Sequence, residues 1–105
     1  MNFDEQAQNH CKQIVEHFGA SNQVDKSIEE IGELLTEIGR YRIGQRRDVD
    51  RVVSEIADVM VMLTQLSIIF GTQAVEREVE YKLQRAMKRV ANEKEFLRGK
   101  NEAVL

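Results

Sequence analysis

Two acidic segments form the most distinctive pattern in this chain. Residues 26–34 read Lys-Ser-Ile-Glu-Glu-Ile-Gly-Glu-Leu, and residues 54–59 read Ser-Glu-Ile-Ala-Asp-Val. Each segment contains two carboxylates three positions apart, Glu30 with Glu33 and Glu55 with Asp58. This spacing places both members of a pair on one face of a helix, one turn apart. We therefore expect two neighbouring helices whose four carboxylates converge.

Acidic pairs of this kind need a positive partner. Like charges one turn apart on a helix repel each other and destabilise the helix. The second pair also shares a helical sector with apolar residues, namely Val59, Met62, Leu66 and Ile69. Burying an unpaired carboxylate is very costly, and Mg²⁺ prefers surroundings made only of oxygen atoms. The pattern therefore predicts a magnesium site formed by the four carboxylates.

Composition predicts an all-α fold in a single domain. The chain has 105 residues, no Pro and only 6 Gly, and a chain rich in Glu, Gln, Lys, Arg, Leu and Ile favours long helices with short connections. Hydrophobic spacing predicts four helices in a bundle-like arrangement, with Gly19 and Gly71 as helix stops and Ser21 or Asn22 as a cap. The expected ranges are about 2–18, 23–42, 48–70 and 73–97.

Charge and cysteine content limit the ligands and the cellular location that we expect for this protein. The formal net charge is −3, which argues against a general nucleic-acid binder, because such proteins carry a strong basic excess. Cys11 is the single cysteine, so no disulfide framework is expected and a reducing cytoplasm is the simpler location. No signal peptide is apparent, and the apolar stretch 59–70 is too short to span a bilayer. We expect no membrane partner.

The apolar stripes predict how the helices pack. In the second helix the expected core residues are Val24, Ile28, Ile31, Leu34, Leu35 and Ile38. A second stripe, beside the apolar one, contains Lys26, Glu30, Glu33 and Glu37. Taken alone, this stripe fits a solvated acidic face as well as it fits a metal site. Beyond Asp58 the third helix is apolar on most sides, which is typical of an enclosed helix. Four short helices can hardly enclose it, so we expect a second subunit.

Basic residues provide candidates for phosphate contacts. Four arginines lie in or near the connection between the second and third helices: Arg40, Arg42, Arg46 and Arg47. They fit a solvated linker or phosphate binding equally well. In the fourth helix, Val75, Val79, Leu83, Ala86 and Val90 are expected to face inward. Its second half is mainly basic, and Lys82, Arg85 and Arg89 are candidate ligand contacts, although charged faces mostly serve solvation.

The two acidic segments resemble a known family. Glu29-Glu30-Ile31-Gly32-Glu33 followed by Glu55-Ile56-Ala57-Asp58 is similar to the E-E-x-x-E … E-x-x-D pattern of the MazG-like, all-α nucleoside triphosphate pyrophosphohydrolases. Lys26, the apolar run 59–63 and the basic residues of the fourth helix extend the likeness over about residues 26–89. The downstream basic residues do not form a tight motif.

The resemblance implies an activity and assigns roles to residues. It implies Mg²⁺-dependent hydrolysis of a nucleoside triphosphate to a monophosphate and pyrophosphate, with Mn²⁺ as a substitute metal and a dimer or a pair of dimers as the assembly. Nucleotide-pool cleansing is a compatible role. The metal ligands would be Glu30, Glu33, Glu55 and Asp58. Glu29 would assist them or orient water, and Lys26 would bind phosphate oxygens.

Three other functions fit the same pattern. A phosphoribosyl-ATP pyrophosphatase and a dUTP- or dCTP-specific relative share acidic helices of this sort. A catalytically silent helical interaction module would leave the carboxylates solvated. A di-iron bundle is set aside, because it needs Glu-x-x-His pairs and neither histidine follows a Glu at that spacing.

Overall fold

Four α-helices make up the protein. The computed structural model describes residues 4–44 and 48–104, and it contains no β-strand within these ranges. The helices are α1 (Glu5–Phe18), α2 (Ala20–Arg42), α3 (Val49–Phe70) and α4 (Thr72–Val104). The prediction of an all-α protein with four helices is therefore confirmed. The chain divides into two compact units, Met1–Gly71 and Thr72–Leu105, and we describe each by itself.

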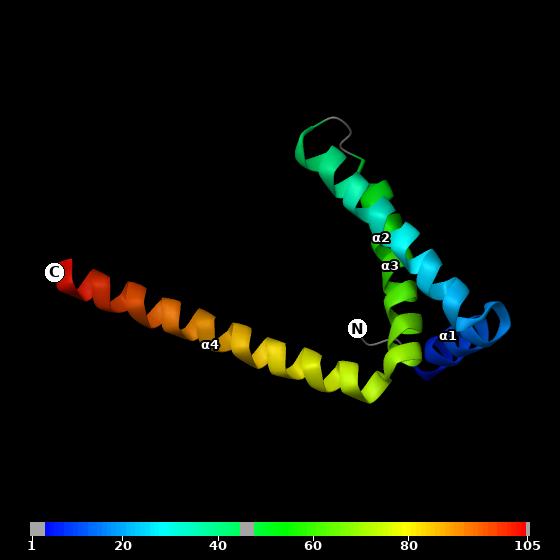
Figure 1. Cartoon of the computed structure of the whole chain (residues 1–105). Helices are drawn as coiled ribbons and strands as arrows, with labels where there is room; N and C mark the ends of the chain where they lie inside the picture. Colours follow the sequence, from blue (N-terminus) through cyan, green and yellow to red (C-terminus); the bar gives the residue numbers. More distant parts are fainter. Residues whose placement is uncertain (1–3, 45–47, 105) are drawn as a thin grey trace. The chain divides into compact units, whose positions relative to one another are not determined.

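The first unit is a three-helix assembly built on the α2–α3 pair. These two helices run antiparallel and side by side, and α1 packs against both of them (Figure 1). The thiol of Cys11 on α1 lies 4.0 Å from the backbone oxygen of Val61, in the second half of α3. Burial raises the pKa of this thiol, so Cys11 serves here as a small buried side chain.

The first helix begins and ends near its predicted limits. Asp4 caps it, since its carboxylate accepts a hydrogen bond from the Ala7 N–H at 2.8 Å. Positions 2 and 3, which the prediction included, lie outside the described residues. The helix ends at Phe18, and Gly19 follows with φ +94°, a conformation that favours glycine. The predicted stop at Gly19 is confirmed.

The start of α2 corrects the sequence prediction. The helix begins at Ala20, directly after Gly19, so neither Ser21 nor Asn22 is its cap. The Asn22 side-chain amide instead donates a 2.8 Å hydrogen bond to the backbone oxygen of Phe18. This bond satisfies a carbonyl at the end of α1, which is why Asn22 functions in the turn although it lies inside α2.

The third helix has clear signals at both ends. Its cap is Asp48, whose carboxylate accepts a 3.2 Å hydrogen bond from the Arg51 N–H. It ends at Phe70, where Gly71 takes φ +122° and donates a 2.8 Å hydrogen bond to the Ser67 carbonyl. Both ends agree with the sequence prediction.

The inner face of α2 is polar, which the sequence analysis did not predict. The buried residues of α2 are Gln23, Ser27 and Glu37, and those of α3 are Val59, Met62 and Gln65. Glu37 belongs to the predicted acidic stripe, whereas Gln23 and Ser27 belong to neither predicted stripe. Buried polar side chains must be hydrogen-bonded or must bind something, so this interface has a purpose beyond hydrophobic packing.

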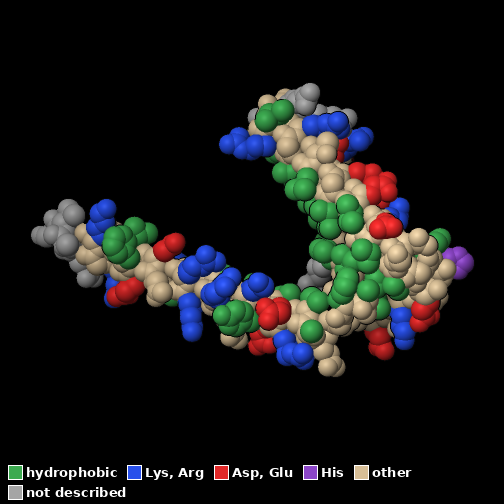
Figure 2. All heavy atoms as spheres, in the orientation of Figure 1, with side chains coloured by type: hydrophobic (Ala, Val, Ile, Leu, Met, Phe, Trp, Pro, Cys, Tyr) green, Lys and Arg blue, Asp and Glu red, His purple; other side chains and the backbone are tan. Residues whose placement is uncertain are grey.

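Half of the expected core stripe of α2 is exposed, whereas Val24, Ile31 and Leu34 are half-buried. Ile28 and Leu35 are 67% and 66% exposed, and Ile38 is also exposed. Several apolar residues of α3 are exposed as well, including Val49, Val53, Ile56, Leu63 and Phe70. Figure 2 shows hydrophobic side chains gathered over α2 and α3. The prediction that Ile28, Leu35 and Ile38 are core residues is wrong for the single chain, because the polar stripe occupies the contact with α3.

The second unit consists of α4 alone. Val75, Val79, Leu83 and Val90, which were predicted to face inward, are all exposed within this unit. The helix also continues to Val104, beyond its predicted end near residue 97. An exposed i,i+3 ion pair joins Arg98 and Glu95 at 2.8 Å in this last part, and such pairs stabilise a helix by about 0.2–0.5 kcal/mol.

The apolar character of α3 extends beyond the stretch that the sequence analysis considered. By length and composition, Val49–Phe70 could cross a membrane. A single such helix is weak evidence, because the core helix of a soluble protein has the same length and composition.

Candidate functional site

The α2–α3 interface brings three of the four predicted carboxylates together. One carboxylate oxygen each from Glu30, Glu55 and Asp58 lies within 4.8 Å of the others. Glu30 comes from α2, and the other two come from α3. The i,i+3 spacing of Glu55 and Asp58 aligns them on one face, and the antiparallel packing of the helices sets Glu30 opposite.

The environment of these carboxylates makes the cluster unusual. Oε2 of Glu30 and Oε2 of Glu55 are buried and accept no hydrogen bond from any described residue. A buried carboxylate oxygen without a donor is unfavourable, and most such atoms in folded proteins find a partner. A hard divalent cation would satisfy both oxygens, so the residues present fit Mg²⁺ or Mn²⁺.

Glu33 lies beside the cluster rather than within the 4.8 Å group. Its pKa is raised mainly by the negative charge of Glu30, with smaller contributions from desolvation, from Glu55, from a side-chain hydrogen bond with Glu30, and from Glu29. Glu33 therefore lies in the field of Glu30 and Glu55, although its side chain is exposed. Glu29 is exposed too, at the edge of the group.

Lys26 is the cation nearest to the cluster among the contacts described. Its ammonium nitrogen lies 3.5 Å from Oε1 of Glu30, one turn along α2. The Lys26 side chain is 53% exposed, whereas the Glu30 side chain is only 14% exposed. Glu30 therefore has one oxygen facing a solvated ammonium group and one buried oxygen with no donor.

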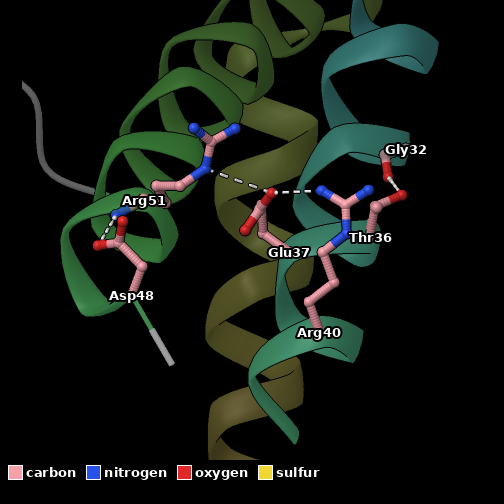
Figure 3. Close-up of polar contacts among 6 residues, drawn as sticks. All are labelled: Gly32, Thr36, Glu37, Arg40, Asp48 and Arg51. Carbon is pink, nitrogen blue, oxygen red and sulfur yellow. Dashed lines mark hydrogen bonds and ion pairs between the residues drawn. The ribbon is translucent and has the colours of Figure 1, made fainter. Parts of the chain in front are cut away.

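The buried carboxylate of Glu37 links α2 and α3 at another point of their contact. Glu37 accepts a 3.0 Å hydrogen bond from Arg40 on its own helix, and lies 3.5 Å from the guanidinium of Arg51 on α3 (Figure 3). The carboxylate is only 5% exposed. Glu37 and Arg51 thus link the two helices that carry the acidic cluster. Arg40 belongs to this link, while Arg46 and Arg47 lie outside the described residues.

A pocket opens next to the acidic cluster and was not predicted from the sequence. It has a volume of about 450 Å³, and its charged lining residues are Lys26, Glu30 and Asp58. Gln23 and Gln65 line it as well, and their side-chain amides are joined by a buried 2.7 Å hydrogen bond. A sequence signal existed, because each glutamine is seven positions, or two helical turns, from a carboxylate of the cluster.

The basic candidates of α4 belong to the second unit. Lys82, Arg85 and Arg89 lie along that helix and are exposed. The Arg85 guanidinium lies over the Tyr81 ring, 5.8 Å from its centre, which is a cation–π contact. Their role in binding a ligand stays a prediction.

Comparison with known proteins adds no family assignment. No protein-family model, no curated protein and no solved structure matches this chain. Fold and site together define an all-α protein with a three-carboxylate cluster between two antiparallel helices.

Proposed function

We propose that this protein is a Mg²⁺-dependent nucleoside triphosphate pyrophosphohydrolase of the MazG-like kind. The observation that carries the proposal is the convergence of Glu30, Glu55 and Asp58 within 4.8 Å, together with two buried carboxylate oxygens that have no donor. Their sequence pattern resembles that of the family, and the adjoining pocket provides space for the remainder of a nucleotide.

The charge balance of the cluster supports a metal-bound polyphosphate as the ligand. Three carboxylates and one lysine leave a net negative site, which would repel a bare triphosphate. When bound, Mg²⁺ supplies the positive charge that neutralises the phosphate oxygens and the leaving pyrophosphate. The Lys26 side chain is 53% exposed and lines the pocket, so its ammonium group can turn from Glu30 to a phosphate oxygen.

Each carboxylate has a role in the proposed site that follows from its position. In this proposal Glu30, Glu55 and Asp58 hold the metal, with Glu33 completing the set. Glu29 orients water or assists the ligands. The raised pKa of Glu33 reflects its nearness to Glu30, and a cation at the cluster would favour the ionised form of this carboxyl group.

A nucleotide panel tests the proposal. The protein is incubated with each of the common ribo- and deoxyribonucleoside triphosphates and Mg²⁺, and pyrophosphate and orthophosphate are measured separately. We expect pyrophosphate release that EDTA abolishes and Mn²⁺ restores. Glu30→Gln should lose at least about 100-fold in rate, since the site depends on charge stabilisation, whereas Glu16→Gln, an exposed carboxylate on α1, should not change it.

The outcomes separate the alternatives. Orthophosphate alone, or no turnover of any nucleotide, contradicts the proposal. Turnover only of phosphoribosyl-ATP, or only of dUTP or dCTP, assigns the chain to one of the narrower activities. A catalytically silent module predicts that Mg²⁺ changes neither turnover nor thermal stability.

We also propose that the active form is a homo-oligomer in the cytoplasm. Hydrophobic side chains gather over α2 and α3 (Figure 2), where Ile28, Leu35 and Phe70 are exposed, and contiguous apolar patches often mark protein interfaces. Light scattering should give at least twice the mass of one chain, and Leu35→Asp should lower that mass. A monomeric wild type contradicts this proposal.

Cell fractionation should place the protein in the supernatant, and recovery in the membrane pellet would instead indicate that α3 inserts into a membrane.

A further inference from the structure

Two polar pairs join α2 to α3, one on each side of the acidic cluster. In the first, which we call the amide pair, Nε2 of Gln23 donates a 2.7 Å hydrogen bond to Oε1 of Gln65, and both residues are buried. In the second, the interhelical ion pair, Nε of Arg51 lies 3.5 Å from Oε1 of Glu37 (Figure 3). The Glu37 side chain is only 5% exposed. Each pair takes one residue from each helix.

The two pairs are evenly spaced about the acidic cluster. On α2, Gln23 lies seven residues before Glu30, and Glu37 lies seven residues after it. On α3, the partners of these two residues lie seven residues from Asp58, in the opposite order. Seven residues are close to two helical turns, or about 10 Å. The amide pair, the carboxylates and the interhelical ion pair are therefore three successive polar layers on one face of each helix.

The carboxylates alone do not specify how α2 lies along α3. Glu33 follows Glu30 by three residues, which is about one helical turn. If α2 slid along α3 by those three residues, Glu33 would stand opposite Asp58 in place of Glu30. An acidic stripe that repeats after one turn is thus compatible with more than one register of the two helices.

The flanking pairs distinguish these registers. After a slide of three residues, Arg51 would face Arg40 instead of Glu37, and two like charges would meet. After a slide of four residues, Glu37 would face Glu55, and two carboxylates would meet. Both alternatives also separate the two glutamines of the amide pair, whose buried amides need hydrogen-bond partners. Polar residues at a helix interface are a well-attested means of fixing register.

We propose that the amide pair and the interhelical ion pair are positioning pairs for the metal site. They select the register of α2 on α3 in which Glu30, Glu55 and Asp58 converge on one cation. Their role is specificity rather than stability, because replacing both members of a buried polar pair by apolar side chains is often neutral or stabilising for folding. The inference rests on the metal site of the proposed function and names the residues that hold this site together.

Paired substitutions separate positioning from structural support. Gln23→Met with Gln65→Met removes the amide pair, and Glu37→Met with Arg51→Met removes the interhelical ion pair. Arg40, which also contacts Glu37, is 42% exposed and can turn to solvent. Titration calorimetry with Mn²⁺ measures metal affinity, and urea denaturation in EDTA measures stability. We expect each paired variant to bind Mn²⁺ at least about tenfold more weakly, while its urea midpoint equals or exceeds that of the wild type.

A matched control and the opposite results make this test decisive. Glu80→Met with Gln84→Met removes an exposed hydrogen-bonded pair within α4 and should change neither quantity. Wild-type Mn²⁺ affinity in either paired variant contradicts the inference. A lower urea midpoint together with weaker Mn²⁺ binding also contradicts it, because the pair would then give only structural support.

Single substitutions at Arg51 decide the question if a paired variant does not fold. Only one guanidinium nitrogen of Arg51 makes the contact with Glu37, so the positive charge matters more than the planar shape of the group. Arg51→Lys should therefore keep most of the Mn²⁺ affinity, whereas Arg51→Met should lose about tenfold. Equal affinities in these two variants contradict the inference.

Measurements of turnover distinguish this inference from the proposed function. Mn²⁺ binding with the expected losses in the variants, but no turnover of any nucleotide, would refute the proposed function and support the positioning role. Pyrophosphate release by the wild type, with unchanged Mn²⁺ affinity in the paired variants, would do the reverse. A wild-type protein that binds no Mn²⁺ overturns both.

Discussion

Replacing Glu55 by glutamine should stabilise the metal-free protein. Glu55 belongs with Glu30 and Asp58 to a group of carboxylate oxygens within 4.8 Å of one another, and its Oε2 atom is buried with no hydrogen-bond donor among the described residues. Glutamine has the same shape, removes one negative charge and supplies an amide N–H₂ group. That group can donate to a neighbouring carboxylate, so the substitution replaces repulsion by a hydrogen bond.

The size of the effect follows from the distances. Two unit charges at this separation repel by about 3 kcal/mol at an effective dielectric constant of 20, and by about 1 kcal/mol in water. Glu30 is mostly buried and belongs nearer the first value, whereas Asp58 is exposed and belongs nearer the second. Allowing for relaxation of the side chains, we expect Glu55→Gln to raise the free energy of unfolding by about 1 to 3 kcal/mol at pH 7.

Urea and thermal denaturation in EDTA measure this change, and 1 kcal/mol corresponds to about 4–8 °C in Tm for a domain of this size. Millimolar Mg²⁺ should stabilise the wild type but stabilise Glu55→Gln much less, because a ligand stabilises only the folded state that binds it. Glu16→Gln, which alters an exposed carboxylate on α1, should match the wild type in both conditions. If Glu55→Gln is less stable than the wild type in EDTA, the repulsion argument is wrong. If Mg²⁺ does not affect the wild type, the metal assignment is wrong.

Three further predictions concern pH, helix docking and capping. The pKa of Glu33 is raised in the folded state by its acidic neighbours. Between the pKa of Glu33 in the unfolded state and its pKa in the folded state, the folded state binds more protons, so the metal-free protein should lose stability as pH rises through that interval. Glu33→Gln should flatten this part of a stability–pH profile, and an unchanged profile would show that another group is responsible. Arg51→Met removes the cation that links α3 to the buried carboxylate of Glu37 and should lower the free energy of unfolding in urea by about 1–3 kcal/mol. Arg98→Met, in an exposed pair on α4, should lower it by under about 1 kcal/mol. Equal losses would mean that burial of Glu37 does not strengthen its ion pair with Arg51. Asp4→Ala removes the cap of α1 and should cost about 1 kcal/mol, with a matching loss of helical circular dichroism on mild heating, and no loss would mean that the N-terminus of α1 is frayed in solution.

The sequence by itself determined the helices and most of the acidic cluster. Hydrophobic periodicity and glycine positions are local signals, so the ends of α1 and α3 at Gly19 and Gly71 could be predicted to within a residue. The i,i+3 spacing of Glu55 and Asp58 is a property of one helix and needs no tertiary information. Helix ends without a strong local stop were less accurate, as the continuation of α4 through Gly99 shows.

Only the tertiary structure decided which face of α2 meets α3. Periodicity shows that apolar and polar residues form separate stripes, but it does not show which stripe a partner helix covers. Here the contact buries Gln23, Ser27 and Glu37 and leaves Ile28 and Leu35 exposed. The Gln23–Gln65 hydrogen bond and the Glu37–Arg51 ion pair each join residues far apart in the sequence. Such pairs depend on the rotation and register of two packed helices, and these are set by the whole interface rather than by either helix.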